Sequence, residues 1–144
     1  MKGLKTKIGF VALGGHIITQ NLTFRSIIKT LGTQSYEFYG LEDGFRVFDT
    51  GNLHVLGLES FVDGYQRVMP GFYSGSSSDN KFSIADNNGH QIPERIERAI
   101  DFIRQSRLDY IVGSGGDVSG LQLKVLSDAI KDSCLEWCES GKWW

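Results

Sequence analysis

The sequence has few of the residues that build disulfide frameworks or metal clusters. Its 144 residues include two cysteines, three histidines and two prolines. Cys134 and Cys138 lie four residues apart and would supply half of a tetrahedral zinc site, but the histidines show no ligand spacing that completes it. We therefore expect ordinary thiols at these positions and assign no metal ligand.

Charge of one sign and long apolar runs are missing as well. The formal net charge is −2, which gives no broad electrostatic attraction to nucleic acid or to an anionic membrane. The apolar runs are far shorter than a membrane span, and the N-terminal residues show no signal-peptide pattern. We expect a cytoplasmic protein that binds neither nucleic acid nor membrane.

Glycine, by contrast, is abundant, with 18 residues that cluster at predicted turns. Gly14-Gly15 and Gly115-Gly116 each follow an apolar, strand-like run (residues 7–13 and 109–112) and each precede a helix-like run. Glycine lets the backbone approach an anion closely, and the start of the next helix offers unpaired N–H groups. The pattern favours a phosphate-binding α/β protein over one whose tight turns hold no ligand.

The remaining elements follow from periodicity and turn residues. Apolar residues at helical spacing predict a helix that ends before Gly32, and Pro93 suits the first turn of another helix. Short strands are expected at residues 36–39, 45–48 and 53–56, a short helix at 60–67, a long surface loop at 71–89, and a buried strand at 109–112 before a helix that continues towards Trp137. This order predicts an open, mostly parallel sheet with helices on both faces, a Rossmann-like three-layer α/β fold. Binding sites in such sheets lie at the carboxyl ends of the strands, where both glycine turns are placed.

Four motifs, in order, resemble those of the phosphofructokinases and cover roughly residues 7–130. They lie at residues 8–21 followed by Arg25, at 40–45, at 71–76 and at 108–119. The resemblance implies a single phosphofructokinase-like domain over residues 1–144, whose two glycine turns hold a nucleotide triphosphate or pyrophosphate. At the positions that hold these phosphates in the family, the matching residues are Gly14, Gly15, Gly115, Gly116, Asp117 and Ser119. We add as candidate ligand-binding residues, which lie within or near the motifs, His16, Asn21, Gly75, Ser76 and Lys81. Arg25 and Lys29 fall where bacterial members bind effector phosphates at a subunit contact.

Other interpretations of these residues stay open. Asp117 holds magnesium in the family pattern, but an aspartate at this place is equally suited to cap a helix. Arg25 and Lys29 are four residues apart, which is also the spacing of a solvated basic pair on one helix face.

The sequence also departs from the family pattern. His16 replaces an aspartate, Thr19 and Val118 replace glycines, and Ser78 falls where ATP-dependent members carry an arginine, for which Lys81 is the candidate substitute. The family segment with the catalytic aspartate would begin only after Trp144. We therefore expect no sugar kinase activity, because phosphoryl transfer requires both partners to be positioned and a group to orient the nucleophile.

The leading hypothesis is a non-catalytic, homo-oligomeric binder that senses or sequesters a nucleotide-like or phosphorylated small molecule without a cofactor, as a phage-type sponge for a nucleotide signal would. One alternative is a metal-dependent phosphoanhydride hydrolase that uses Asp117, His16 and magnesium. The other is a regulatory module that joins the oligomer of a full-length phosphofructokinase.

Overall fold

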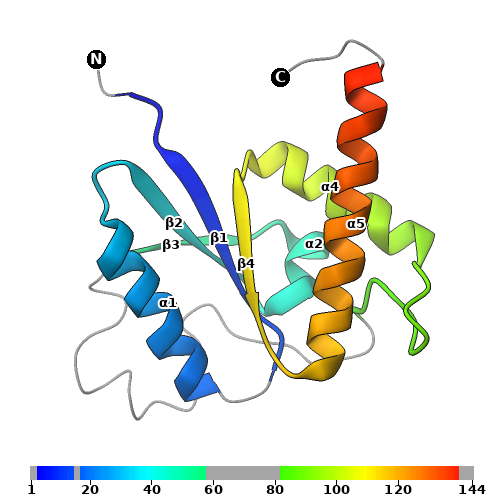
Figure 1. The fold of residues 1–144 in the computed structure, drawn as a ribbon, viewed down its shortest axis with the longest axis horizontal. Coiled ribbons are helices and arrows are strands. Elements are labelled where there is room, and N and C mark those ends of the chain that lie inside the picture. The colour runs from blue at the N-terminus through cyan, green and yellow to red at the C-terminus, as the bar shows by residue number, and fades with distance from the viewer. Residues whose placement is uncertain (1–2, 15–16, 58–81, 140–144) are drawn as a thin grey trace.

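A computed structural model describes the backbone of residues 3–14, 17–57 and 82–139, and the side chains of these residues except 17–19 and 134–139. Within these residues the sheet has four strands, in the order β3-β2-β1-β4 (Figure 1). Strands β1 (Thr6–Ala12), β2 (Tyr36–Leu41) and β4 (Tyr110–Ser114) run parallel, and β3 (Leu53–Leu56) pairs with β2 in the antiparallel direction. The predicted open, mostly parallel sheet is confirmed.

Helices lie on both faces of this sheet, as Figure 1 shows. Helix α1 (Ile17–Leu31) covers one face, whereas α4 (Pro93–Ser106) and α5 (Asp117–Glu139) cover the other. A short 3₁₀ helix, η1 (Gly44–Arg46), and α2 (Val47–Thr50) lie on the same side as α4. No helix in the described part of the chain is both long enough and apolar enough to span a membrane.

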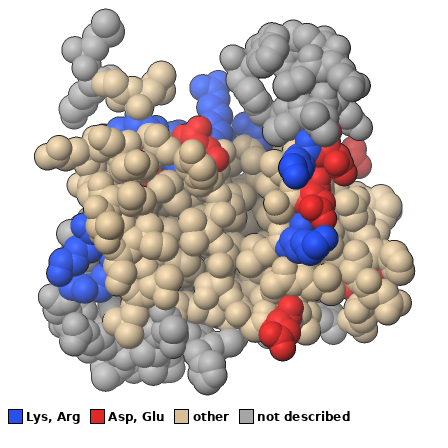
Figure 2. Space-filling view, viewed as in Figure 1, with Lys and Arg blue, Asp and Glu red and all other residues tan. Residues whose placement is uncertain are grey.

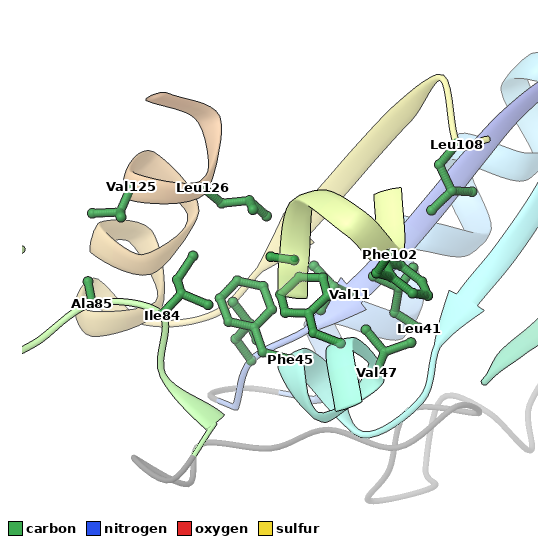
Figure 3. Packing of buried hydrophobic residues seen from close by; sticks show 13 residues of the cluster. Val11, Leu41, Phe45, Val47, Ile84, Ala85, Phe102, Leu108, Val125 and Leu126 are labelled. Carbon is green, nitrogen blue, oxygen red and sulfur yellow. The ribbon is translucent and has the colours of Figure 1, made fainter. Parts of the chain in front are cut away.

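The alternation of side chains along β1 builds two cores, one on each face of the sheet. Phe10 points towards α1, where its ring stacks on that of Phe24 with a centroid separation of 4.6 Å. Val11 points to the opposite face and joins the cluster under α2, α4 and α5, which includes Phe45 and Phe102 (Figure 3). Burial of these side chains fixes the positions of the strand ends that carry the glycine turns.

An ion-pair cluster fastens α2 to α4. The Asp49 carboxylate accepts a hydrogen bond from Nη1 of Arg95 at 2.7 Å and another from Nη1 of Arg98 at 2.8 Å. Burial raises the pKa of Asp49, but the two guanidinium groups lower it by more, so the pKa lies below its ordinary value. The charged form of Asp49 is therefore stabilised by the fold.

Acidic and basic side chains alternate along the outer surface of α5. Figure 2 shows that the rest of this face of the molecule is mostly uncharged. Lys124 and Asp128 form one of the pairs, with Nζ and Oδ2 3.1 Å apart. This surface is therefore patterned with charges of both signs.

Two predicted strands differ from the structure. Residues 45–48 are helical (η1 and α2), because Asp43 and Gly44 adopt left-handed φ values of 49° and 64° that turn the chain out of β2. The predicted strand at 109–112 exists as β4, but it is an edge strand of the described sheet, and Tyr110 is 62% exposed. The sequence prediction of a buried strand was wrong because an apolar run does not reveal whether both of its neighbours are present.

The other predicted elements lie partly outside the described residues. The helix at 60–67 and residues 71–81 of the predicted loop belong to the part that is not described. Residues 82–89 contain no strand or α-helix and form a turn in which Asp86 accepts hydrogen bonds from the backbone N–H groups of Asn88 and His90. The helices after Pro93 and after the second glycine turn are confirmed, and α5 extends past Trp137.

Candidate functional site

The two glycine turns lie side by side at one edge of the sheet. Strands β1 and β4 are adjacent and parallel, and their last paired residues are Ala12 and Ser114. The backbone N–H of Leu13 then donates to the carbonyl of Ser114 at 2.9 Å, which extends the pairing into the turns. Both turns therefore lie at the carboxyl ends of their strands, as expected, and the structure adds that these two strands are neighbours.

Ser119 joins the second turn to the first. Its side chain is 8% exposed, and its hydroxyl donates to the carbonyl of Leu13 at 2.7 Å. A Cβ on Gly115 would lie 2.3 Å from the Cβ of Ser119 and 2.4 Å from its Oγ. Glycine at position 115 is therefore required for the packing of Ser119, independently of any ligand.

Gly116 is in a different environment from Gly115. A Cβ on Gly116 would meet no heavy atom within 4 Å, and the residues that follow, Asp117 and Val118, are exposed. The second turn therefore presents open space at Gly116, where the backbone is accessible from solvent.

The first turn is supported by a side chain that sequence reasoning missed. Gly14 has a φ of 86°, in the left-handed region that favours glycine. Its carbonyl accepts a hydrogen bond from Nε2 of Gln20, which is 3% exposed. No local signal in the sequence could have found Gln20, because its burial and the carbonyl that it meets depend on the tertiary structure.

Both turns lead directly into helices. Helix α1 begins at Ile17 and α5 begins at Asp117, so the N-termini of both lie at the edge where the turns meet. The first backbone N–H groups of a helix have no partner within the helix and carry a partial positive charge. Helix N-termini of this kind can hold an anion.

A third turn, after β2, lies at the same edge, but its acidic side chains are already engaged in hydrogen bonds and ion pairs within the protein. Oε2 of Glu42 accepts a hydrogen bond from Nδ2 of Asn52 at 2.7 Å, and Oε1 lies 3.4 Å from Nε2 of His54. The bond from Asn52, with a further contribution from His54, lowers the pKa of Glu42 against a smaller effect of desolvation. Asp43 is paired with Arg46 at 3.0 Å. The contacts of Glu42 fasten the turn to the start of β3, whereas the Asp43–Arg46 pair links the turn to η1.

Comparison with known proteins supports the resemblance to phosphofructokinases that the sequence motifs indicated. No family model matches the sequence. The chain is 28% identical over 123 residues to the ATP-dependent 6-phosphofructokinase of Edwardsiella ictaluri, and 27% identical over 122 residues to those of Vibrio campbellii and Vibrio parahaemolyticus. Each alignment covers 85% of this chain and 35% of the relative. The chain is phosphofructokinase-like. It spans about a third of the length of these curated relatives.

Within this phosphofructokinase-like chain, the candidate site residues that the structure describes fall into two groups. Gly14, Gly115, Gly116, Asp117 and Ser119 come together at the paired turns, and the N-terminal part of α1 adds Asn21, which is 2% exposed and faces the interior. The second group lies further along α1 and consists of Arg25 and Lys29.

The basic pair lies away from the turns. An α-helix rises about 1.5 Å per residue, so Lys29 is roughly 18 Å along the axis from the start of α1. Lys29 is exposed, whereas Arg25 is half-buried and engaged in an interaction within the protein. The structure therefore does not bring this pair to the glycine turns, and the separate effector position that the resemblance implies for it stays a prediction.

Five candidate ligand-binding residues lie outside the described residues. They are Gly15, His16, Gly75, Ser76 and Lys81. Among the residues that are described, no three His, Cys, Asp or Glu side chains are grouped closely enough to hold a metal ion.

Two hollows on the described surface of the phosphofructokinase-like chain lie away from the turns. One, of about 550 Å³, is on the outer face of α1 around Ser26 and Ile27. The other, of about 280 Å³, runs beside β4 and is lined by apolar residues such as Ile111, Leu123 and Ile130.

Proposed function

We propose that this domain binds a nucleotide-like or otherwise phosphorylated small molecule at the paired glycine turns and does not transfer its phosphoryl group. Such a protein senses or sequesters its ligand. The observation that carries the proposal is the meeting of the two turns at one sheet edge, where α1 and α5 also begin.

The chemistry of the described turns supports binding more than catalysis. Backbone N–H groups and helix N-termini hold an anion through hydrogen bonds and partial charge. Of the described residues in the two turns, Asp117 alone has an ionisable side chain. The Ser119 hydroxyl donates its proton to a backbone carbonyl, so it contributes to structure. Phosphoryl transfer needs a group that orients the nucleophile and charges that neutralise the phosphates, and a single carboxylate does not supply both.

The names of the relatives suggest the first ligands to test. These relatives are ATP-dependent 6-phosphofructokinases, which by name act with ATP on a phosphorylated sugar. ATP, ADP, pyrophosphate and fructose 6-phosphate therefore form the initial panel, each measured by calorimetry with and without magnesium.

The test then separates a binder from an enzyme. After binding, the protein is denatured by heat and the released ligand is identified by chromatography. We expect at least one member of the panel to bind and to be recovered intact. Absence of binding across the panel would refute the proposal, and recovery of a hydrolysed ligand would support the metal-dependent hydrolase instead.

A pair of glycine variants localises the binding. Gly116→Ala adds a methyl group to the open space at the second turn, and Gly3→Ala adds one, also without a clash, before the opposite end of β1. We expect Gly116→Ala to weaken binding while Gly3→Ala binds as the unmodified protein does. Equal affinities of the two variants would place the ligand elsewhere.

Homo-oligomer formation and cytoplasmic residence stay predictions. The exposed Tyr110 on edge strand β4 favours assembly, because an unpaired strand edge is usually covered. Light scattering over a range of concentrations measures the mass directly, and a monomer at the highest concentration would show that the prediction is wrong.

A further inference from the structure

Two consecutive carbonyls in the first glycine turn are each held by a side chain from a following helix. The carbonyl of Leu13 accepts a hydrogen bond from the hydroxyl of Ser119 in α5 at 2.7 Å. The carbonyl of Gly14 accepts one from Nε2 of Gln20 in α1. We call these four residues the carbonyl clamp.

The donors of the carbonyl clamp are protected from solvent. Ser119 is 8% exposed and Gln20 is 3% exposed, so water competes poorly for either hydrogen bond. Ser119 reaches the carbonyl of Leu13 across 106 residues of sequence, and it does so because Gly115 has no side chain in the way. The clamp therefore joins α1, α5, β1 and the second turn into one unit.

The direction of these carbonyls affects any anion bound nearby. A carbonyl oxygen carries partial negative charge and repels an oxyanion, whereas an N–H group attracts it. A turn that binds an anion must therefore present its N–H groups and direct its carbonyls elsewhere. A hydrogen bond to each carbonyl oxygen fixes that direction before the ligand arrives, which reduces the reorganisation needed on binding.

We propose that Ser119 and Gln20 are positioning residues for an oxyanion, and that they act by engaging the carbonyl oxygens of Leu13 and Gly14 in hydrogen bonds and so fixing their direction. The proposal rests on the proposed function and deepens it. It assigns Ser119 to the support of the turn, whereas the family resemblance implied a residue that touches the ligand. The ligand chemistry that this geometry fits is a phosphate or pyrophosphate group bound through backbone N–H groups.

The test uses Ser119→Ala and Gln20→Met, which remove the donors while keeping most of the side-chain volume. Ser106→Ala is the matched control, because the hydroxyl of Ser106 also donates to a backbone carbonyl, that of Ile103, at 3.2 Å at the end of α4. Pyrophosphate and ATP are the probes. Affinities are measured by calorimetry well below the unfolding midpoint, where circular dichroism shows each variant to be fully folded.

We expect each clamp variant to bind the probes about tenfold more weakly, the effect of one intramolecular hydrogen bond, and Ser106→Ala to bind as the unmodified protein does. A second measurement distinguishes positioning from general stability. At saturating pyrophosphate, the phosphorus NMR resonances of the bound probe should differ between Ser119→Ala and the unmodified protein, because the oxyanion then lies beside a reoriented carbonyl.

The outcomes separate the two proposals. If the unmodified protein binds neither probe nor the rest of the panel, the proposed function fails and the positioning role fails with it. If it binds a probe, but the clamp variants bind with unchanged affinity and unchanged phosphorus resonances, only the positioning role is overturned. An equal loss in Ser106→Ala would also overturn it, since the effect would then not depend on the turn.

Discussion

Replacement of Gly115 by alanine should destabilise the protein far more than the same change one residue later. The added Cβ would lie 2.3 Å from the Cβ of Ser119, 2.4 Å from its Oγ and 3.3 Å from the carbonyl oxygen of Leu13. Two of these distances are far below van der Waals contact, and the obstructing atoms are close to the α5 backbone, so Ser119 cannot simply rotate aside. At Gly116 the same methyl group would meet no heavy atom within 4 Å.

The size of the effect follows from two losses. Overpacking a filled site costs about 1–3 kcal/mol. Displacing Ser119 also leaves the carbonyl of Leu13 without its donor, which costs about 1–3 kcal/mol for a buried group. Alanine restricts the unfolded chain more than glycine does, and this reduced entropy of the unfolded state stabilises the variant by about 0.4–1 kcal/mol. The net loss for Gly115→Ala is therefore about 3 kcal/mol, whereas Gly116→Ala should change the free energy of unfolding by about 0.5 kcal/mol or less.

Urea unfolding followed by circular dichroism measures both variants against the unmodified protein. A loss of about 3 kcal/mol corresponds to a fall in Tm of about 6–12 °C for a chain of this length. Gly115→Ala combined with Ser119→Gly removes the obstructing Cβ and should recover part of the loss. Equal free energies of unfolding for Gly115→Ala and Gly116→Ala would refute the packing argument. If the double variant is no more stable than Gly115→Ala, the loss of stability arises from the backbone at position 115 and not from contact with Ser119.

Three further predictions concern the scaffold around the site. Asp49→Asn should cost about 1–2 kcal/mol at neutral pH, because it removes the charged acceptor shared by two arginines of α4. The pKa of Asp49 is lowered in the folded state. Its contribution to stability is therefore present above the ordinary aspartate pKa of about 3.9 and is lost as the pH falls through the lower folded value. The free energies of unfolding in urea of the two proteins should converge in acid, and a difference that stays constant with pH would contradict the assignment. Gln122→Ala should lower the free energy of unfolding by about 3 kcal/mol in thermal unfolding. The buried amide of Gln122 accepts hydrogen bonds from the N–H groups of Ile84 and Ala85 at 2.8 and 3.1 Å and donates one to the carbonyl of Ala85. A loss below 1 kcal/mol would show that water takes the place of the amide in these hydrogen bonds. Gly120→Ala should stabilise the protein by about 0.5–1 kcal/mol in the same assay, because this glycine lies within α5 with open space around it, and any destabilisation would mean that the site is more crowded than the structure shows.

The sequence was a good guide wherever the signal is local. The apolar run over residues 7–13 and the helical spacing of apolar residues after Pro93 predicted β1 and α4 with little error. The glycine turns were found for the same reason, since a strand, two glycines and a helix follow one another directly along the chain. Residues 45–48 were assigned wrongly because Phe45, Val47 and Phe48 suit a short strand as well as a buried helical turn.

The placement of the two glycine turns at the carboxyl ends of strands was predicted, whereas the contacts that build the turns were not. The family motif drew attention to Gly115 and Ser119 as residues that contact a ligand. In the structure they pack against each other, and the hydroxyl of Ser119 is used on Leu13, which is 106 residues away. Gln20 was not identified at all, because nothing near it in the sequence shows which carbonyl it meets.

By itself, then, the sequence determined the class of fold, the two strand-to-helix turns and the likeness to phosphofructokinases, because periodicity and turn chemistry act between residues a few positions apart. The tertiary structure alone decided that β1 and β4 are neighbours, that β4 lies at an edge of the described sheet, and which carbonyls Ser119 and Gln20 hold. Strand order and buried hydrogen-bond partners depend on segments far apart in the chain, and these meet only when the whole core closes around them.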